Sequence, residues 1–410
     1  MRKNLLVGQS GGPTAVINST LYGVIHAARD AGIHGIYGAV NGIEGLLQGK
    51  IVDIESEPPE LIEELKFTPG AALGGCRYKL PAENSPEGKV ALKRVFDVFQ
   101  QYEIGYFIYI GGNDSMDTAD KIAREAERRG NDIKVIGAPK TIDNDLVGTY
   151  YCPGFGSAAK YVAVSTREAG IHAVSMTTSE PVTILETVGR ESGWLAASAT
   201  LARTKEGDAP HILCLPECPF DFNNFVDKVR AIYNKQGWVF IVVGEGLRDP
   251  NGNYVSADTE AVSVDAFGHP ALEGISFTLK QIIESKLNLK TTTIKLDICM
   301  QSAMHFASLR DSKDAIMVGR EAVHAATRGL SGMMVALVPQ IGKDESSTQL
   351  VPLHYVANSE RKLPPEWIIE DGYDVSYEYL SYVRPLIAGQ VEIPIIDGLP
   401  VYSRLRLRYV

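Results

Sequence analysis

Short apolar runs alternate with longer amphipathic stretches along most of the 410-residue chain. The apolar runs have the length and composition of strands buried on both faces, and the stretches between them carry apolar residues at helical spacing. The predicted strands cover residues 4–7, 35–40, 106–110, 133–138, 181–185, 212–215, 238–243, 292–298 and 333–338. The predicted helices cover residues 16–28, 116–129, 191–203, 222–235, 272–287 and 313–328. Such alternation predicts an α/β fold built on doubly wound, mostly parallel sheets.

The length of the chain and its 45% content of hydrophobic residues predict two domains. We expect the first α/β domain at residues 1–157, completed by residues 303–340, and the second at residues 158–302. Beyond Pro339 the alternation ends in a polar, proline-containing stretch and a tyrosine-rich segment. We interpret residues 341–410 as a C-terminal extension that packs on one domain.

Charge and cysteine content narrow the class of protein. A net charge of -10 without a basic run argues against a nucleic-acid partner, because phosphate backbones are bound mainly by clustered Lys and Arg. The five cysteines are scattered and form no Cys-x-x-Cys pair, so we expect neither a disulfide framework nor a zinc site. The chain shows no signal-peptide pattern and no run of about 18 apolar residues. We therefore expect a cytoplasmic protein with no membrane partner.

A charged segment, residues 139–145, directly follows the apolar run 133–138. In an open α/β sheet, ligands bind beyond the carboxyl ends of the strands, so chemistry is expected here. Lys140, Asp143 and Asp145 suit phosphate and Mg2+, and in an extended segment the two acids would face one ligand together. The alternative interpretation is a solvated turn after a buried strand, since Asp and Asn favour turns.

Two glycine turns, at residues 9–13 and 111–115, each lie between a predicted strand and a predicted helix. The backbone N–H groups and the positive end of the helix dipole at such a junction suit a phosphate, although a glycine turn alone is weak evidence. If their strands are neighbours in a parallel sheet, both turns and the segment 139–145 meet at one edge. Arg77, in a glycine-rich loop, could reach a phosphate there or lie in solvent. Glu245 also follows a predicted strand.

The order and composition of five motifs resemble the phosphofructokinase family over roughly residues 4–340. The motifs are residues 11–18, 111–115, 139–145, 188–190 and 244–246. Thr-Ile-Asp-Asn-Asp, in the third motif, is the most specific of them. The resemblance implies two α/β domains of the phosphofructokinase type and phosphoryl transfer to a sugar phosphate, with Mg2+ as the cofactor.

The resemblance also implies roles for individual residues. Asp143 would take the proton from the sugar 1-hydroxyl, and Arg190 would stabilise charge during a transfer in which positioning and cations matter most. Thr141 and Asp145 would help to hold substrate and metal, and Asn113 would join Asp145 at the metal. The other sugar-binding residues would be Val188, Gly189, Glu245, Gln301 and His305. The residues lining the donor side would be Gly12, Arg77, Gly112, Asn113 and Ser115.

Asp114 and Lys140 bear on the identity of the phosphoryl donor. ATP-using relatives usually have glycine at both places, whereas the pyrophosphate-using branch has aspartate and lysine. A carboxylate at 114 would add charge and bulk where the inner phosphate of ATP must pass, and Lys140 would add a cation for the small diphosphate. The pair therefore favours pyrophosphate. Alternatively, Asp114 only caps the helix that follows, which would leave Lys140 unexplained.

Two features depart from the family pattern. Asn113 stands where an aspartate associated with Mg2+ is usual, so one anionic metal contact is lost. The arginines expected to bind the sugar phosphate are also absent: Pro181 occupies one of these positions, and the segment 297–305 lacks the other. The positive charge could instead come from Lys295, His305 or Arg384.

The residues and the resemblance together indicate pyrophosphate-dependent phosphorylation of fructose 6-phosphate at the 1-hydroxyl, giving fructose 1,6-bisphosphate and phosphate in a reversible reaction. We expect a homo-oligomer, either a dimer or a tetramer. The alternatives are an ATP-dependent 6-phosphofructokinase and a catalytically impaired regulatory subunit, although Asp143 and Arg190 are both intact. A nucleotide-binding oxidoreductase ranks last, because neither glycine turn completes Gly-x-Gly-x-x-Gly.

Overall fold

The chain forms two compact units in the computed structural model, which describes residues 3–256, 274–340 and 345–410. The first unit contains Met1–Ser157, Gln301–Glu360 and Gly389–Val410. The second unit contains Ala158–Met300 and Arg361–Ala388. Residues 341–410, which we interpreted as one C-terminal extension, are therefore shared between the two units.

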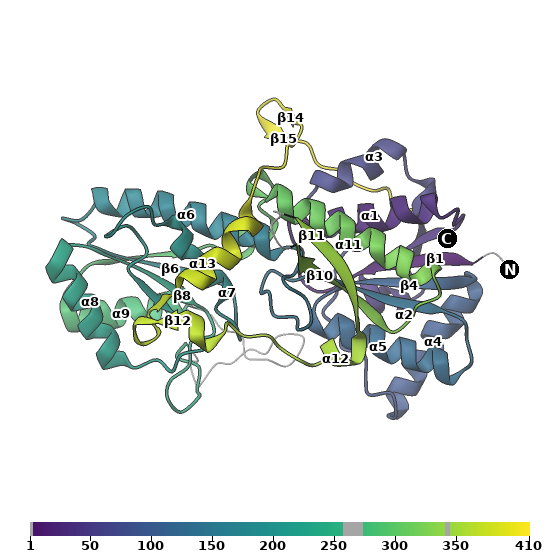
Figure 1. The fold of residues 1–410 in the computed structure, drawn as a ribbon, viewed down its shortest axis with the longest axis horizontal. Helices are drawn as coiled ribbons and strands as arrows, with labels where there is room; N and C mark the ends of the chain where they lie inside the picture. The colour runs from purple at the N-terminus through teal and green to yellow at the C-terminus, as the bar shows by residue number, and fades with distance from the viewer. Residues whose placement is uncertain (1–2, 257–273, 341–344) are drawn as a thin grey trace. The chain divides into compact units, whose positions relative to one another are not determined.

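A seven-stranded sheet lies at the centre of the first unit (Figure 1). The order of its described strands is β11-β10-β5-β4-β1-β2-β3. Neighbouring strands are parallel except at the two edges, where β3 and β11 run antiparallel to their neighbours. The strands are β1 (Asn4–Gln9), β2 (Ile36–Ala39), β3 (Ile51–Asp53), β4 (Ile104–Gly111), β5 (Lys134–Pro139), β10 (Met333–Pro339) and β11 (Ser346–Pro352). The run 333–338, expected to be the last strand, is thus followed by another.

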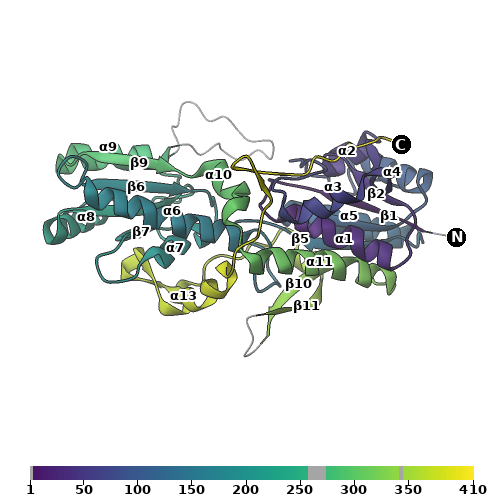
Figure 2. The same cartoon turned by 90° about the horizontal axis from the view of Figure 1, so that it is seen from above.

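Helices cover both faces of this sheet, as the alternation predicts. On one face, Phe107 and Tyr109 of β4 join a buried apolar cluster with residues of α2, α4, α5 and α12. On the other, α1 and α11 pack so closely that a Cβ added to Gly23 would lie 2.2 Å from the Ile316 carbonyl oxygen (Figure 2). Glycine at position 23 therefore lets the two helix backbones touch. The helices are α1 (Ile17–Asp30), α2 (Gly42–Leu47), α3 (Pro59–Glu64), α4 (Pro86–Gln101), α5 (Asn113–Arg128), α11 (Leu309–Thr327) and α12 (Leu353–Val356).

The second unit contains a parallel sheet whose described strands have the order β7-β8-β6-β9. These strands are β6 (Val182–Thr187), β7 (Ile212–Cys214), β8 (Val239–Gly244) and β9 (Thr291–Lys295). The helices are α6 (Phe155–Ser175), which begins at the unit boundary, α7 (Trp194–Ser198), α8 (Phe222–Gln236), α9 (Ile275–Leu287) and α13 (Tyr377–Val383). The predicted α/β class with mostly parallel sheets is therefore confirmed in both units.

Two predicted elements of this region are wrong in part. The predicted helix 191–203 is a short α-helix, α7, followed by a 3-10 helix at Ala199–Ala202. The predicted strand 292–298 ends at Lys295, because the chain reverses at Asp297, where φ is +43°, and begins helix α10 (Asp297–Ser302). The first residues of the predicted helix 272–287 lie outside the described residues.

Four aromatic side chains hold the tyrosine-rich segment in the second unit. Trp194, at the start of α7, packs against Trp367, Tyr379 and Tyr382, with ring centroids 6.0, 6.1 and 5.2 Å away. The fully buried Tyr379 donates its hydroxyl to the Trp194 carbonyl oxygen at 2.6 Å. Burial of these large rings explains why residues 361–388 belong to this unit.

Short strand pairs complete the described structure. They are β12 (Ile368–Ile369) with β13 (Asp374–Val375) in the second unit and β14 (Ile395–Ile396) with β15 (Leu399–Pro400) in the first. No helix within the described ranges is long and apolar enough to cross a membrane.

Candidate active site

Three neighbouring parallel strands of the first unit end at one edge of the sheet. β4 pairs with β1 on one side and with β5 on the other, and Gly111 lies opposite Pro139. The glycine turn 10–13, the loop 111–115 and the segment 140–145 therefore leave the sheet together. The strand order runs outward from β1 to β2 and from β4 to β5, so this edge is the switch point at which open α/β sheets bind ligands.

Lys140 is a buried cation at this edge. The residue is 4% exposed, and its ammonium donates a hydrogen bond to the Gly12 carbonyl oxygen at 2.7 Å. Gly11 has a φ of +75°, and a Cβ there would lie 2.9 Å from Lys140 Nζ. Glycine at position 11 therefore leaves the space that the ammonium occupies. The side chain of Gln301 also reaches this turn, since its Oε1 lies 3.4 Å from where a Cβ on Gly12 would be.

Burial and three neighbouring charges set the protonation of Lys140. Burial lowers the pKa of the Lys140 ammonium to about 8, the carboxylates of Asp143 and Asp145 raise this pKa, and Arg77 lowers it. At neutral pH the ammonium is therefore still mainly charged. Because an anion bound nearby would favour the charged form further, this edge of the sheet suits a phosphate ligand.

Asp143 and Asp145 lie on a turn rather than on an extended segment. Between them, the fully buried Asn144 has a φ of +56°, and its side-chain oxygen accepts a hydrogen bond from the Cys152 N–H at 3.0 Å. The Thr141 hydroxyl accepts a hydrogen bond from the Asp143 N–H at 3.1 Å. The expected alternation of an extended strand is thus wrong here. Both carboxylates nevertheless lie close enough to the buried ammonium to act on its pKa.

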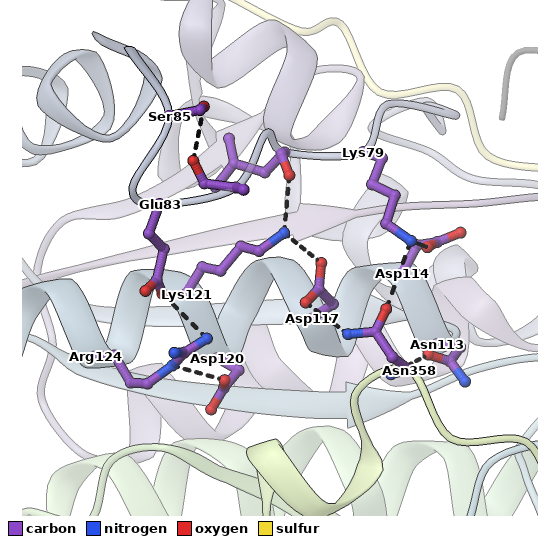
Figure 3. Close-up of polar contacts among 12 residues, drawn as sticks. Lys79, Glu83, Ser85, Asn113, Asp114, Asp117, Asp120, Lys121, Arg124 and Asn358 are labelled. Atoms are coloured by element: carbon purple, nitrogen blue, oxygen red, sulfur yellow. Dashed lines mark hydrogen bonds and ion pairs between the residues drawn. The ribbon is translucent and has the colours of Figure 1, made fainter. Parts of the chain in front are cut away.

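The donor loop 111–115 runs directly into helix α5. Gly112 is the N-cap of α5, and Asp114 lies in the first turn of the helix. The alternative interpretation of Asp114 as the cap is therefore wrong. Its carboxylate instead pairs with the Lys79 ammonium at 3.2 Å (Figure 3). Ser115 is buried against Gly111, where a Cβ would lie 2.1 Å from the Ser115 hydroxyl oxygen, so the loop has room only for glycine at position 111.

Asn113, expected near the metal, makes two hydrogen bonds to backbone that is distant in the sequence. Its Oδ1 accepts from the Asn358 N–H at 2.7 Å (Figure 3). Its amide nitrogen donates to the Ser359 carbonyl oxygen at 2.5 Å. Both polar groups of the side chain are thus engaged by residues 358–359.

Arg77 and His305 are both exposed residues of the first unit. The loop that carries Arg77 lies against the glycine turn, because the Cys76 carbonyl oxygen accepts from the Gly11 N–H at 3.0 Å. His305 is on the 3-10 helix Met304–Phe306, and its ring packs against Phe306 with centroids 5.0 Å apart. The structure therefore places the loop of Arg77 beside the glycine turn 10–13.

The second unit brings four predicted sugar-binding residues together. β6 and β8 are neighbours and end in register, with Thr187 opposite Gly244. The turn 188–190 follows β6, and Glu245 follows β8. Glu245 Oε1 accepts a hydrogen bond from the Gly189 N–H at 3.3 Å. Val188, Gly189, Arg190 and Glu245 thus lie at one edge of this sheet.

Close backbone packing fixes this second edge. A Cβ on Gly246 would lie 1.6 Å from the Arg190 carbonyl oxygen, so the two strand ends touch through their backbones. The pKa of the Glu245 carboxyl is raised, mainly by burial, and the Gly189 N–H and the Arg190 guanidinium offset only part of this shift. A half-buried carboxylate beside a cation can accept hydrogen bonds from sugar hydroxyls.

The three cations considered for the sugar phosphate lie in different places. Lys295, in the second unit, pairs with the buried Glu186 at 3.5 Å, and Glu186 also accepts hydrogen bonds from the Ser276 N–H and hydroxyl. Arg384 lies on the 3-10 helix Arg384–Ile387 of the same unit, whereas His305 belongs to the first. Lys295 therefore already has a carboxylate partner.

Three residues beside the candidate site were not found from the sequence. Lys79, Asp117 and Asn358 surround the start of α5 and contact Asp114 or one another (Figure 3). They come from separate parts of the chain and belong to no motif. Asn358 has a φ of +57°, a conformation that asparagine tolerates well but that its identity alone does not predict.

Comparisons with known proteins agree with this geometry. The phosphofructokinase family model matches residues 4–326. The chain is 41% identical to the pyrophosphate--fructose 6-phosphate 1-phosphotransferase of Xanthomonas campestris pv. campestris over 98% of this chain and 96% of that protein. It is 39% identical to the protein of the same name from Halomonas elongata, with the same coverage.

A solved structure has the same fold. The pyrophosphate-dependent phosphofructokinase from Nitrosospira multiformis superimposes with a TM-score of 0.90 at 36% identity, covering 100% of this chain and 98% of that one. A family model that spans most of the chain, relatives that align along nearly all of it and a shared architecture lead to one conclusion: this chain belongs to the phosphofructokinase family.

Proposed function

We propose that this protein transfers a phosphoryl group from pyrophosphate to the 1-hydroxyl of fructose 6-phosphate, giving fructose 1,6-bisphosphate and phosphate. The observation that carries the proposal is the buried Lys140 ammonium at the Gly11–Gly12 turn, with Asp114 in the first turn of α5. A buried cation suits a small donor whose charge is concentrated in two phosphates. The names of the relatives from Xanthomonas campestris, Halomonas elongata and Nitrosospira multiformis support the same donor.

Asp143 is the proposed general base of the reaction. The sugar 1-oxygen forms a bond to phosphorus, the bond from this phosphorus to the bridging oxygen of pyrophosphate breaks, and the 1-hydroxyl proton passes to Asp143. The Thr141 hydroxyl and the buried Asn144 hold the backbone of the turn that carries Asp143. Lys140 offsets the charge on the departing phosphate. The reaction is reversible because pyrophosphate is a less forceful donor than ATP.

Arg190 and Glu245 are the proposed sugar-phosphate residues of the second unit. A guanidinium can contact two oxygens of a phosphoryl group at once, which positions it as well as neutralising it. The half-buried Glu245 is suited to accept hydrogen bonds from sugar hydroxyls, with Gly189 fixing its orientation. Thr141, in the first unit, is a further proposed substrate contact.

Enzymes of this family generally need a divalent metal. Across the described ranges, no group of three or more His, Cys, Asp or Glu side chains could hold a metal ion. Mg2+ at phosphate sites is commonly held by one or two carboxylates together with substrate phosphates, and Asp143 and Asp145 supply two on one turn. These residues fit Mg2+ brought in with the donor. Bound there, the ion would neutralise charge on the phosphates.

A coupled assay with purified protein, Mg2+ and fructose 6-phosphate tests the proposal. We expect fructose 1,6-bisphosphate to form with pyrophosphate at a catalytic efficiency well above that with ATP, and to disappear when phosphate is supplied in the reverse direction. Asp143→Ser serves as the inactive control. A protein that prefers ATP, or that turns over neither donor, would overturn the proposal.

We also propose that the enzyme acts in the cytoplasm as a homo-oligomer, either a dimer or a tetramer. Light scattering on the purified protein measures the mass directly, and a monomeric mass at working concentration would contradict this part of the proposal.

A further inference from the structure

We propose that residues 358–360 form a strap that positions the donor loop, and that Asn113 is a positioning residue for the donor rather than a metal ligand. The proposal rests on the proposed function, because it concerns the donor side of the same site. Four sets of contacts within the first unit carry it.

The first set joins the strap to the start of α5. Asn113 donates to the Ser359 carbonyl oxygen at 2.5 Å and accepts from the Asn358 N–H at 2.7 Å. The side chain therefore pairs with the strap as a backbone amide would. Because Asn113 and Asp114 are adjacent in the first turn, whatever fixes one of them also restricts the other.

The second set anchors Asn358 to a buried polar group. Its side-chain nitrogen donates to Asp117 Oδ1 at 2.9 Å (Figure 3). Asp117 is 4% exposed and pairs with the Lys121 ammonium at 2.7 Å, and Lys121 also donates to the Leu80 carbonyl oxygen at 2.9 Å. Both carboxylate oxygens of the buried Asp117 are hydrogen-bonded, which restricts its side chain to one orientation. Asp117 therefore gives the strap a rigid attachment.

The third set connects the strap to the residue that bears on donor choice. The Lys79 ammonium lies 3.2 Å from an Asp114 carboxylate oxygen and 3.5 Å from Asn358 Oδ1 (Figure 3). Lys79 therefore lies between Asp114 and the strap. This lysine links the Asp114 carboxylate to the strap.

The fourth set lies at the other end of the strap. Glu360 forms an antiparallel β-bridge with Leu146, a fully buried residue that directly follows Asp145. The strap thus connects the donor loop 111–115 to the turn that carries the proposed catalytic acids. The three residues of the strap thus hold the two loops at a fixed distance from each other. Phosphoryl transfer requires this, because the donor and the hydroxyl activated by the base must be held close together.

These contacts also explain why the residue is an amide. An aspartate at position 113, as the family pattern would suggest, could still accept from the Asn358 N–H. Its second oxygen would then face the Ser359 carbonyl oxygen, where the Asn113 amide now donates. Two acceptors at hydrogen-bond distance repel each other, so the carboxylate would push the strap away.

The experiment measures donor kinetics for Asn113→Asp and Asn358→Gly against Arg124→Ala. Glycine tolerates the φ of +57° at position 358 and removes only the side-chain bonds. Arg124, on the same helix, pairs with Glu83 and Asp120 and serves as the matched control. The readouts are KM and kcat for pyrophosphate and for fructose 6-phosphate, the half-saturating Mg2+ concentration and the melting temperature.

We expect Asn113→Asp to lower the catalytic efficiency with pyrophosphate by about tenfold, mainly through KM, as loss of one or two hydrogen bonds implies. Asn358→Gly should lower it by about threefold, through the lost contacts to Asp117 and Lys79. The KM for fructose 6-phosphate and the half-saturating Mg2+ concentration should stay unchanged in both variants. Arg124→Ala should match the wild type in every kinetic readout.

Two results would overturn the strap. The first is wild-type pyrophosphate kinetics in Asn113→Asp. The second is a lower half-saturating Mg2+ concentration in Asn113→Asp with an unchanged KM for pyrophosphate. That second result would identify position 113 as a metal contact. If Asn113→Asp fails to fold, the test rests on Asn358→Gly: wild-type pyrophosphate kinetics in that variant would overturn the strap. If the wild type prefers ATP, the proposed function fails, but the strap is still tested, because the same losses must then appear with ATP.

Discussion

Replacement of Lys140 by methionine should stabilise the protein while it removes pyrophosphate turnover. The side chain is buried, and moving the pKa of its ammonium from 10.5 to about 8 corresponds to about 3 kcal/mol against the charged form at neutral pH. Methionine has a similar length and no charge. Methionine cannot donate the hydrogen bond to the Gly12 carbonyl oxygen, and this loss cancels about 1 kcal/mol of the gain in stability. The net expectation is a gain of about 2 kcal/mol in the free energy of unfolding at pH 7.

The pH dependence distinguishes this cause from better packing. Below pH 8 the ammonium is protonated in both the folded and the unfolded chain, so the folded wild type carries the full cost of burial. Between pH 8 and 10.5 the folded protein releases the proton while the unfolded chain keeps it, and the stability of the wild type rises with pH. The advantage of Lys140→Met should therefore be largest below pH 8 and vanish toward pH 10.5.

Calorimetry at pH 7, 9 and 10 gives the required comparison. A gain of about 2 kcal/mol should raise the melting temperature of a domain of this size by about 4 to 8 °C at pH 7. Lys134, at the start of the same strand, pairs with Asp132 at 2.7 Å on the surface, so Lys134→Met should change stability by less than about 0.5 kcal/mol. A Lys140→Met protein that is less stable than the wild type at pH 7, or whose advantage is the same at pH 7 and pH 10, would refute the reasoning.

Three further substitutions probe individual roles. Asp143→Ser should lower turnover by about 100-fold or more with a smaller effect on the KM for fructose 6-phosphate, and near-normal turnover in a folded variant would exclude Asp143 as the base. Arg190→Lys should lower kcat about tenfold, since a point charge replaces a two-point contact; unchanged kinetics for both substrates would contradict this role. Asp114→Gly should raise the efficiency with ATP and lower that with pyrophosphate, and a donor ratio equal to that of the wild type would show that Asp114 does not select the donor.

The sequence predicted those parts of the fold that local patterns determine. Buried parallel strands need apolar residues on both faces, so β1, β4 and β5 are visible as continuous runs, and the glycine turns after β1 and β4 mark where helices begin. The prediction assumes that the strands before these turns are neighbours in one sheet, and the pairing of β4 with β1 and β5 confirms this. The meeting of the loops 10–13, 111–115 and 140–145 therefore followed from alternation and topology.

Local patterns failed where the backbone leaves its regular path. The run 292–298 looks extended, yet the positive φ of Asp297 turns the chain into a helix. The positive φ of Asn144 likewise breaks the alternation expected between Asp143 and Asp145. Asparagine and aspartate adopt this conformation more readily than most residues, but they do so in a minority of cases. Their identity alone could not locate these turns.

The prediction that residues 341–410 form one extension packed on one domain is wrong for a different reason. The tyrosine-rich segment is aromatic because its rings pack around Trp194, and β11 is a strand because it pairs with β10. Trp194 lies far from the tyrosine-rich segment in the sequence, whereas β10 directly precedes β11. Composition indicates that such residues are buried somewhere, but it contains no information about the unit against which they pack.

Asn113 shows the same limit at the level of a single side chain. The motif places it in the donor loop, and from the motif alone an amide beside a phosphate site is naturally assigned to the metal. Its hydrogen-bond partner Asn358 is 245 residues away, and this contact, together with that to Ser359, occupies both of its polar groups. An amide held at both ends in this way fixes the loop that carries it. We therefore propose Asp143 and Asp145 as the metal contacts, and we propose that Asn113 serves the donor indirectly, by fixing the loop on which Asp114 lies.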